Sequence, residues 1–455
     1  MYLPRTIDAE LATWAGSSPR KPLVLRGARQ TGKTAAIRQL GRRFELFIEL
    51  NLERFEDRRL VDGCRSAAEL LAALRARANL TSFASNTLVF IDEIQESPAA
   101  ITWLRFLQED HPEIAVVAAG SLLEVRLQEG GFSFPVGRVT FRYLRPFSFF
   151  EFLDAQGRDV LGVHVRESVA TLTPLSRAEH EQALDLLRDY LVVGGMPEAV
   201  ARWADRHSPV AVRQIHGDLV QAFAEDIVKY QGAGDRGHLE AAFDHLRHHY
   251  GLRFKQENFA PGYRSELMKT ALARLEGAMV IRRVWPTSSE QLPLQTRARA
   301  APKLLPLDVG LALATMGAPL TDLRDRPLDD LLDGRVAEMF VGQQLLATQI
   351  RADEALHFWM TESASANAEI DYLMAGPAGL RPIEVKAGAS GTLKSLHQFL
   401  HRSQTTTGYR LYSGPLSDQT HRVKMGESVL EMRLISLPLY AAGLVAEAPP
   451  NAMAS

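Results

Sequence analysis

The 455-residue chain has only one cysteine, Cys64, which excludes an intramolecular disulfide and a cysteine-rich zinc site. It has no apolar run near the roughly 18 residues that a membrane span needs, and its start, MYLPRTIDAELATW, lacks the apolar stretch of a signal peptide. These absences favour a cytoplasmic protein without a membrane partner. The formal net charge of −2 argues against a nucleic-acid binder that is basic throughout, but leaves room for a local basic surface.

What is present predicts an α/β multidomain protein of about two to four domains. Short branched apolar runs at 22–25, 88–91 and 114–119 are typical of buried parallel strands, and helix-like segments at 66–78 and 100–110 lie between them. This alternation predicts a parallel sheet covered on both faces. From 177 to about 230 the composition instead predicts helices, broken at VVGGMPE (192–198).

The segment GARQTGKT (27–34) is a complete phosphate-binding loop between a predicted strand and a predicted helix. Gly27 and Gly32 let the backbone fold around phosphates, Lys33 reaches the β- and γ-phosphates, and Thr34 offers a hydroxyl to Mg²⁺. The sequence therefore predicts ATP and Mg²⁺ as cofactors. The expected nucleotide contacts are Gly27, Ala28, Arg29, Gln30, Thr31, Gly32, Lys33, Thr34 and Ala35.

A second element supports this interpretation. The strand LVFID ends in Asp92 and Glu93, which are expected to hold Mg²⁺ and to polarise the attacking water, respectively. The alternative is an ordinary turn. Ser121, after the strand at 114–119, is the candidate sensor of the γ-phosphate, although a serine after glycine is also common in turns.

Arginines beyond this point could complete catalysis from a neighbouring subunit. Arg138, just before a predicted strand, is the candidate finger, with Arg142 and Arg145 as weaker choices and a surface salt bridge as the alternative for each. A finger in trans implies a homo-oligomer, which we expect to be a ring of roughly six or seven subunits.

These residues together resemble a family. RGARQTGKT, FIDEIQ, PVGRV, LRPFSFFEFL and YLVVGGMPEAV are similar to the prokaryotic AAA-type ATPases (AAA_14) that carry a C-terminal DUF4143 domain, and AEMFVGQQLL, FWMT, EIDYL and IEVKAG resemble that second domain. The resemblance implies the following order: an AAA+ core at 1–155, a helical lid at 156–232, a winged-helix unit at 233–325 and a restriction-endonuclease-like domain at 326–440. The end of the sequence itself, residues 441–455, predicts a disordered tail.

The middle segment is locally basic. Residues 233–303 hold 12 Lys and Arg against 7 Asp and Glu, an asymmetry that favours a surface facing DNA. The alternative is a unit that only packs on its neighbours. The candidate DNA contacts are Arg264, Lys269, Arg274, Arg282 and Arg283.

The C-terminal segment carries the order of acids that metal-dependent PD-(D/E)xK nucleases need. Asp371 and Glu384 are expected to chelate Mg²⁺ with the carbonyl of Val385, Lys386 to act on the attacking water, and Glu338 to complete the metal shell. However, Ile370 stands where a proline often precedes the aspartate. A DNA-binding platform without cleavage, and a domain that only holds partners, remain open.

The preferred function is an ATPase that couples its nucleotide state to the binding or remodelling of DNA, with branched or broken DNA as the candidate target. The alternative is a slow, signalling-type ATPase switch whose C-terminal domain binds proteins.

Overall fold

The computed structural model describes most of the chain, namely residues 2–121, 123, 125, 135, 137–229, 236–317, 328, 332–351, 354–361, 368–376, 379–388, 392–425 and 428–449. The chain divides into two compact units. The first comprises Met1–Arg145, Gly277–Val280 and Gln349–Asp353, and the second comprises Pro146–Glu276, Ile281–Thr348 and Glu354–Ser455. Among the described residues, no helix combines the length and apolarity that a bilayer span requires.

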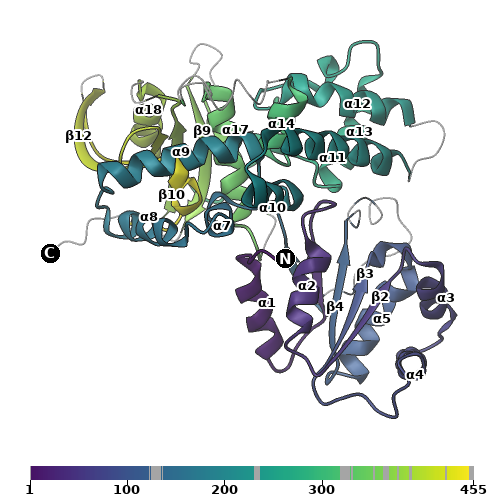
Figure 1. The fold of residues 1–455 in the computed structure, drawn as a ribbon. Helices are drawn as coiled ribbons and strands as arrows, with labels where there is room; N and C mark the ends of the chain where they lie inside the picture. Colours follow the sequence, from purple (N-terminus) through teal and green to yellow (C-terminus); the bar gives the residue numbers. More distant parts are fainter. Residues whose placement is uncertain are drawn as a thin grey trace. The chain divides into compact units, whose positions relative to one another are not determined.

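The first unit is a five-stranded parallel sheet with helices on both faces (Figure 1). The strand order is β2-β3-β4-β1-β5, and β1 lies between β4 and β5, in parallel with both. The elements are α1 (Ile7–Gly16), β1 (Leu23–Arg26), α2 (Lys33–Gly41), β2 (Leu46–Asn51), α3 (Phe55–Gly63), α4 (Ala67–Arg77), β3 (Thr87–Asp92), η1 (Ile94–Glu96), α5 (Pro98–Asp110), β4 (Ala115–Gly120) and β5 (Thr140–Tyr143).

Two apolar cores hold this sheet. One packs α3, α4 and α5 against one face, around Val89 and Ile91, and the other packs α1 and α2 against the opposite face, around Leu88 and Phe90. Successive residues of β3 thus point to opposite cores, which explains why the strand is apolar at every position between its first and last residues. The sequence predicted β1, β3 and β4 correctly, but it did not predict β2.

The second unit begins with helices: α7 (Phe149–Ala155), α8 (Asp159–Thr171), α9 (Arg177–Val193), α10 (Pro197–Arg206), α11 (Pro209–Lys229), α12 (Arg236–His249), η2 (Gln256–Asn258) and α13 (Ser265–Gly277). The helices expected from 177 to 230 are therefore present. The Ser176 hydroxyl caps α9 by accepting a hydrogen bond from the backbone N–H of Glu179, and the Glu179 carboxylate accepts one from the backbone N–H of Ser176. The expected break at 192–198 separates α9 from α10.

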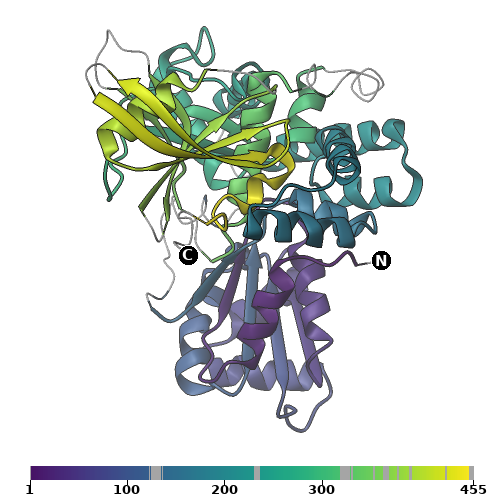
Figure 2. The same ribbon diagram turned by 90° about the vertical axis from the view of Figure 1, so that its left-hand side faces the viewer.

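An eight-stranded mixed sheet follows, in the order β12-β13-β11-β10-β9-β8-β6-β7. Its strands and helices are β6 (Ile281–Thr287), β7 (Lys303–Pro306), α14 (Val309–Thr315), α17 (Gly334–Ala347), β8 (His357–Met360), β9 (Glu369–Gly376), β10 (Gly379–Val385), α18 (Lys394–Ser403), β11 (Thr407–Tyr412), β12 (Ser417–Met425), β13 (Ser428–Pro438) and η3 (Leu439–Leu444). Figure 2 shows the yellow β12–β13 hairpin extending from one edge of this sheet.

The middle segment shares this sheet with the C-terminal segment. The expected order of helix, strand, loop and strand occurs as α13, β6 and β7, with β6 and β7 antiparallel. However, β6 also pairs in parallel with β8, which places Trp285 opposite His357. The winged-helix assignment and the boundary at 325 stay predictions, but the hairpin belongs to a sheet that crosses that boundary.

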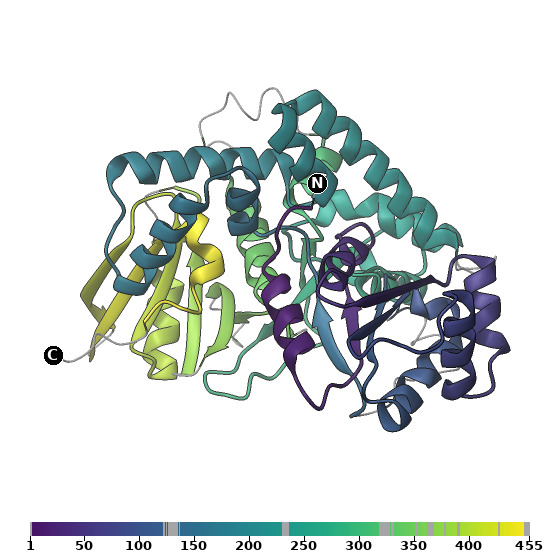
Figure 3. The ribbon, with the colours of Figure 1, turned by 60° about the horizontal axis from the view of Figure 1, so that its bottom comes forward.

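The expectation of a disordered tail from 441 is wrong for residues 441–449. The 3₁₀ helix η3 lies beside α8 and α9 (Figure 3), and Val445 and Ala448 are fully buried. The guanidinium of Arg381 donates hydrogen bonds to the carbonyls of Val445 and Ala448 at 2.8 and 2.9 Å. Burial of apolar side chains and the hydrogen bonds from Arg381 order this segment. Its many small residues, taken alone, are typical of a disordered terminus. Residues 450–455 lie outside the described residues.

Candidate functional site

The phosphate-binding loop joins the end of β1 to the start of α2, as the sequence predicted. A side chain at position 27 would not fit, because a Cβ there would lie 2.3 Å from the carbonyl oxygen of Leu144. Gly32 adopts a φ of 95°, in the left-handed region that other residues rarely enter. The loop therefore requires glycine at both positions, and it presents the N-terminus of α2 as an anion site.

Lys33 lies inside this loop with its side chain folded back. Its ammonium donates hydrogen bonds to the carbonyls of Gly27 and Ala28 at 3.0 and 2.8 Å. Burial lowers the pKa of Lys33, and the carboxylates of Glu93 and Asp92 oppose that shift. The two carbonyls thus accept hydrogen bonds from the N–H groups of the Lys33 ammonium, which would otherwise donate to the phosphates of a nucleotide.

Thr34, near the start of α2, contacts Asp92 at the end of β3. The Thr34 hydroxyl donates to Asp92 Oδ2 at 2.6 Å, and burial raises the pKa of Asp92. A hydroxyl and a carboxylate in contact are hard oxygen ligands, the kind that Mg²⁺ takes beside phosphate oxygens. These two residues fit the expected magnesium ion.

Glu93 follows β3 with a φ of 51°, a left-handed backbone conformation that ends the strand direction. Its Oε2 accepts hydrogen bonds from Gln95 Nε2 at 2.7 Å, from Ser121 Oγ at 3.2 Å and from the backbone N–H of Ser121 at 3.3 Å. The predicted base and the predicted sensor are therefore adjacent. Sequence reasoning missed Gln95, although its position two residues after Glu93 was visible.

Other predicted residues near the loop have protein partners. Arg29 pairs with Glu53 at 3.0 Å, and Thr31 donates to the carbonyl of Ala28 at 2.9 Å. Arg5, which the sequence did not single out, donates to the carbonyls of Thr31 and Arg145 at 3.1 and 2.7 Å. Arg5 is buried and so ties the loop to the chain beyond β5.

The candidate finger arginines Arg138 and Arg142 differ in their surroundings. Arg138 forms an ion pair with Glu109 on α5 at 3.0 Å, and its side chain is 48% exposed. Arg142 pairs with Glu10 at 3.3 Å and is only 17% exposed. Arg138 is thus the more accessible of these two arginines.

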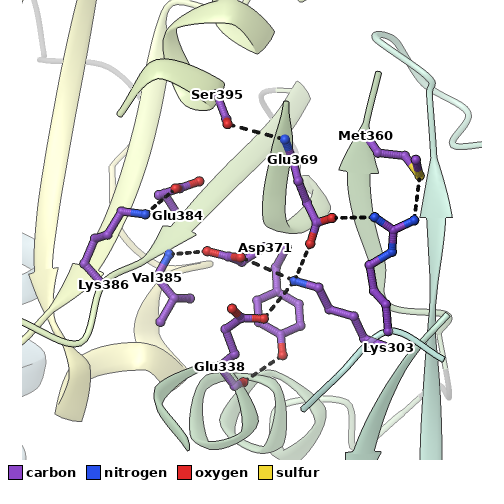
Figure 4. Close-up of polar contacts among 11 residues, drawn as sticks. Lys303, Glu338, Met360, Glu369, Asp371, Glu384, Val385, Lys386 and Ser395 are labelled. Carbon is purple, nitrogen blue, oxygen red and sulfur yellow. Dashed lines mark hydrogen bonds and ion pairs between the residues drawn. The ribbon is translucent and has the colours of Figure 1, made fainter. Parts of the chain in front are cut away.

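In the second unit, two of the predicted nuclease residues, Glu338 and Asp371, surround a cation that the sequence did not single out, together with Glu369, which was not predicted. Lys303, at the start of β7, lies 2.7 Å from Glu338, 2.9 Å from Glu369 and 3.3 Å from Asp371 (Figure 4). Glu338 comes from α17 and the other two acids from β9, so three elements meet at one ammonium. Lys303 could not be found from local spacing, because its partners lie far from it in the chain.

The rest of that predicted site lies alongside. Asp371 Oδ2 accepts from the backbone N–H of Val385 at 2.8 Å, and Lys386 donates to Glu384 Oε1 at 2.6 Å. Glu384 Oε2 is buried and has no hydrogen-bond partner among the described residues. Both Asp371 oxygens are therefore engaged, and the described residues contain no group of acids and histidines arranged to hold a metal ion.

Burial dominates the electrostatics of this cluster. Burial, followed by the charge of Asp371, raises the pKa of Glu338 to about 8 and that of Glu384 to about 7. Burial lowers the pKa of Lys303, but Asp371, Glu338 and Glu369 outweigh it and raise that pKa above its usual value. Lys303 thus stays charged while protons remain on part of the acid cluster near neutral pH.

The candidate DNA contacts separate into two groups. Arg283 pairs with Glu276 at 2.6 Å and is largely buried, and Arg282 donates to the carbonyl of Glu354 at 2.9 Å. Arg274 lines a small pocket between α12 and α13. Arg264 and Lys269, in contrast, are exposed beside and on α13.

Comparison with known families adds to this picture. Residues 19–153 match the model of an AAA domain, AAA_14, and residues 333–435 match DUF4143, a domain of unknown function. The chain combines an AAA domain with a DUF4143 domain. This confirms the family resemblance drawn from the motifs. Residues 184–322 of this AAA protein also match DUF8612, another domain of unknown function, which the sequence did not predict.

Similar structures are distant, and no curated protein matches the chain. The Walker-type ATPase PABY2304 of Pyrococcus abyssi is 12% identical with a TM-score of 0.44, covering 69% of this chain and 96% of its own. The ORC2 protein of Aeropyrum pernix, described as ADPNP–ADP complexes, is 11% identical with a TM-score of 0.29, covering 71% of this chain and 96% of its own.

Proposed function

We propose that this AAA protein is a Mg²⁺-dependent ATPase whose nucleotide state controls the binding of DNA. Four side chains, two at the start of α2 and two at or just after the end of β3, support the hydrolytic part. Lys33 and Thr34 begin the helix after the loop, Asp92 ends β3 and Glu93 follows it directly. The contact between Thr34 and Asp92 carries the proposal, since a hydroxyl and a carboxylate beside the loop are oxygen ligands of the kind that Mg²⁺ takes.

The chain supplies each group that phosphoryl transfer to water needs. Loop N–H groups and the Lys33 ammonium bind the phosphate oxygens, once Lys33 leaves the carbonyls that it now contacts. Thr34 and Asp92 would hold a magnesium ion, which would neutralise charge on the phosphates. Glu93 accepts a proton from the attacking water, and Ser121 beside it contacts the terminal phosphate.

Phosphate release from ATP by the full-length protein tests this proposal. We expect Mg²⁺-dependent turnover that Lys33→Ala abolishes together with nucleotide binding. Arg177→Ala, on an exposed helix start in the second unit, is the control and should leave both unchanged. Lack of both nucleotide retention and phosphate release by the unaltered protein would refute the proposal.

DNA is the proposed partner because of the local positive charge, and the exposed members of that set are Arg264 and Lys269. Arg283 is excluded as the main contact because Glu276 already neutralises it. We therefore expect Arg264→Glu/Lys269→Glu to lower affinity for linear or branched double-stranded DNA at least tenfold, with a smaller dependence on salt. The matched double reversal Arg177→Glu/Arg206→Glu should have little effect, and equal losses in both would refute a specific surface.

A slow switch is the second candidate, and the hydrogen bonds on Glu93 favour it. Gln95 and Ser121 hold the carboxylate that would otherwise activate water. Turnover measured with and without DNA separates the two candidates. A rise of several fold with DNA supports the coupled ATPase, and slow turnover that DNA does not change supports the switch.

A further inference from the structure

The acid cluster of the second unit, formed by Glu338, Glu369, Asp371 and Glu384, supports an inference that is independent of ATP hydrolysis. We propose that Lys303 is an internal replacement for a divalent metal ion, so that the DUF4143 acid cluster works as a metal-free clamp and becomes a metal site only when the Lys303 ammonium is removed.

The geometry of the ammonium supports this inference first. An ammonium has three N–H donors, and Lys303 lies within 3.3 Å of oxygens from three separate carboxylates. The oxygens of Glu338, Glu369 and Asp371 therefore converge on one point, as ligands converge on a metal, and Nζ occupies that point. Figure 4 shows the three carboxylates directed at Lys303 from α17 and β9.

The ammonium is also held in place. Lys303 is 5% exposed and pairs with Val284 in the β6–β7 ladder. Its ammonium lies 5.2 Å from the centre of the Phe358 ring, an additional favourable contact for a cation. The side chain would have to leave a buried position and lose its three ionic partners to admit a metal ion, and burial makes that loss unfavourable.

The charge of the cluster leads to the same conclusion. Arg253 lies 3.1 Å from Glu369, and Lys386 lies 2.6 Å from Glu384, so both acids at the edge of the cluster have their own cation. Lys303 serves Glu338 and Asp371 between them. Three cations thus face four carboxylates, and a divalent ion would bring two further positive charges next to an ammonium that cannot move away.

Glu384 Oε2, which has no hydrogen-bond partner among the described residues, is not sufficient to form a metal site. Mg²⁺ demands near-octahedral coordination with oxygens at about 2.0–2.1 Å. Asp371, which would have to share the ion with Glu384, gives one oxygen to Lys303 and the other to the backbone of Val385. The residues present therefore do not fit the metal ion that the PD-(D/E)xK resemblance implies.

The function of the cluster is then mechanical. Lys303 brings the start of β7 to α17 and β9, which are separated from it by more than thirty residues of chain. It fastens the β6–β7 hairpin across the sheet that holds the DUF4143 strands. A clamp of this kind is independent of metal supply, whereas a nuclease centre is not.

Binding of Mn²⁺ without nucleotide, followed by electron paramagnetic resonance on the full-length chain, tests the proposal. All variants carry Asp92→Asn, which removes the magnesium ligand of the AAA domain. The parent and its Lys303→Arg derivative should bind no Mn²⁺ through the cluster. Lys303→Ala should bind one Mn²⁺ ion, with an affinity at least tenfold above any residual Mn²⁺ binding by the parent. Adding Asp371→Asn to Lys303→Ala should abolish that binding.

Two results overturn the proposal. One is Mn²⁺ binding by the chain that retains Lys303, if Asp371→Asn abolishes it. The other is a folded Lys303→Ala chain, verified by circular dichroism, that binds no Mn²⁺.

A second measurement covers the case in which Lys303→Ala does not fold. The unfolding temperature of the Asp92→Asn chain should be the same in Mn²⁺ and in EDTA. An increase with Mn²⁺ that disappears on Asp371→Asn overturns the clamp, and no increase supports it.

Discussion

The hydroxyl of Thr34 donates a 2.6 Å hydrogen bond to the carboxylate of Asp92, which joins the start of α2 to the end of β3. Since both groups are expected to reach the same magnesium ion, their removal should have similar effects. Asp92→Asn and Thr34→Ala should each lower Mg²⁺-dependent phosphate release about 100-fold or more. Thr34→Ser keeps the hydroxyl and is the matched control. A chain that hydrolyses ATP normally as Thr34→Ala would contradict this arrangement.

Glu93→Gln should separate nucleotide binding from hydrolysis. The amide keeps the size of the side chain but cannot accept the proton of water, so turnover should fall by about 10²–10⁴-fold. Binding of a fluorescent ATP analogue should remain within a few fold of the unaltered protein, because Lys33 and the loop are untouched. Loss of binding to the same extent as turnover would assign Glu93 a structural role.

Arg138 should act only in an assembly. Arg138→Ala should lower turnover about 10³-fold or more if it completes a neighbouring site. Mixing it with Glu93→Gln subunits should then restore part of the activity, since some interfaces combine an intact Glu93 with an intact Arg138. No recovery on mixing would indicate that the arginine acts within its own subunit or remains paired with Glu109.

Lys33 and Thr34 could be predicted because β1, the loop and α2 follow one another in the sequence. Asp92 and Glu93 could be predicted because they come directly after the apolar run of β3. Lys303 is different: only the pairing of β7 in the sheet brings it to Glu338 and Asp371. Strand β2 was missed because five of its six residues are only partly buried and Glu49 interrupts its apolar run, so it lacks a core-strand pattern. The segment 441–449 was missed because its small residues are buried by contacts that no local pattern records.

Asp308 should be important for the stability of the second unit. It is fully buried and accepts hydrogen bonds from the backbone N–H groups of Gly195 and Leu311 at 2.6 and 2.9 Å. Asp308→Ala leaves these donors unpaired and should cost about 3 kcal/mol or more in urea unfolding. Asp244→Ala, an exposed acid on α12, should cost less than about 0.5 kcal/mol. Similar losses in both variants would contradict this role.

Stability should depend on pH through Glu384. Its pKa rises from an ordinary 4.5 to about 7, so the folded protein binds this proton more tightly than the unfolded chain. The resulting stabilisation is complete below pH 4.5 and is lost as pH rises through 7, a difference on the order of 3 kcal/mol. Glu384→Gln should therefore be more stable than the unaltered protein at pH 8.5 and similar to it at pH 4.5.

Urea unfolding at the two pH values measures this difference. The exposed Glu431→Gln serves as the control and should follow the unaltered protein at both. A Glu384→Gln chain that is less stable at pH 8.5 would show that the ion pair with Lys386 outweighs burial.

The pairing of β6 with β8 limits where the protein can bend. Backbone hydrogen bonds between these strands make the hairpin and the DUF4143 strands one rigid layer, and swivelling one past the other would break the ladder and the contacts of Lys303 together. In any motion driven by nucleotide, residues 281–306 and the DUF4143 strands must therefore move together as one rigid body. The hinge of such a motion must lie outside this sheet.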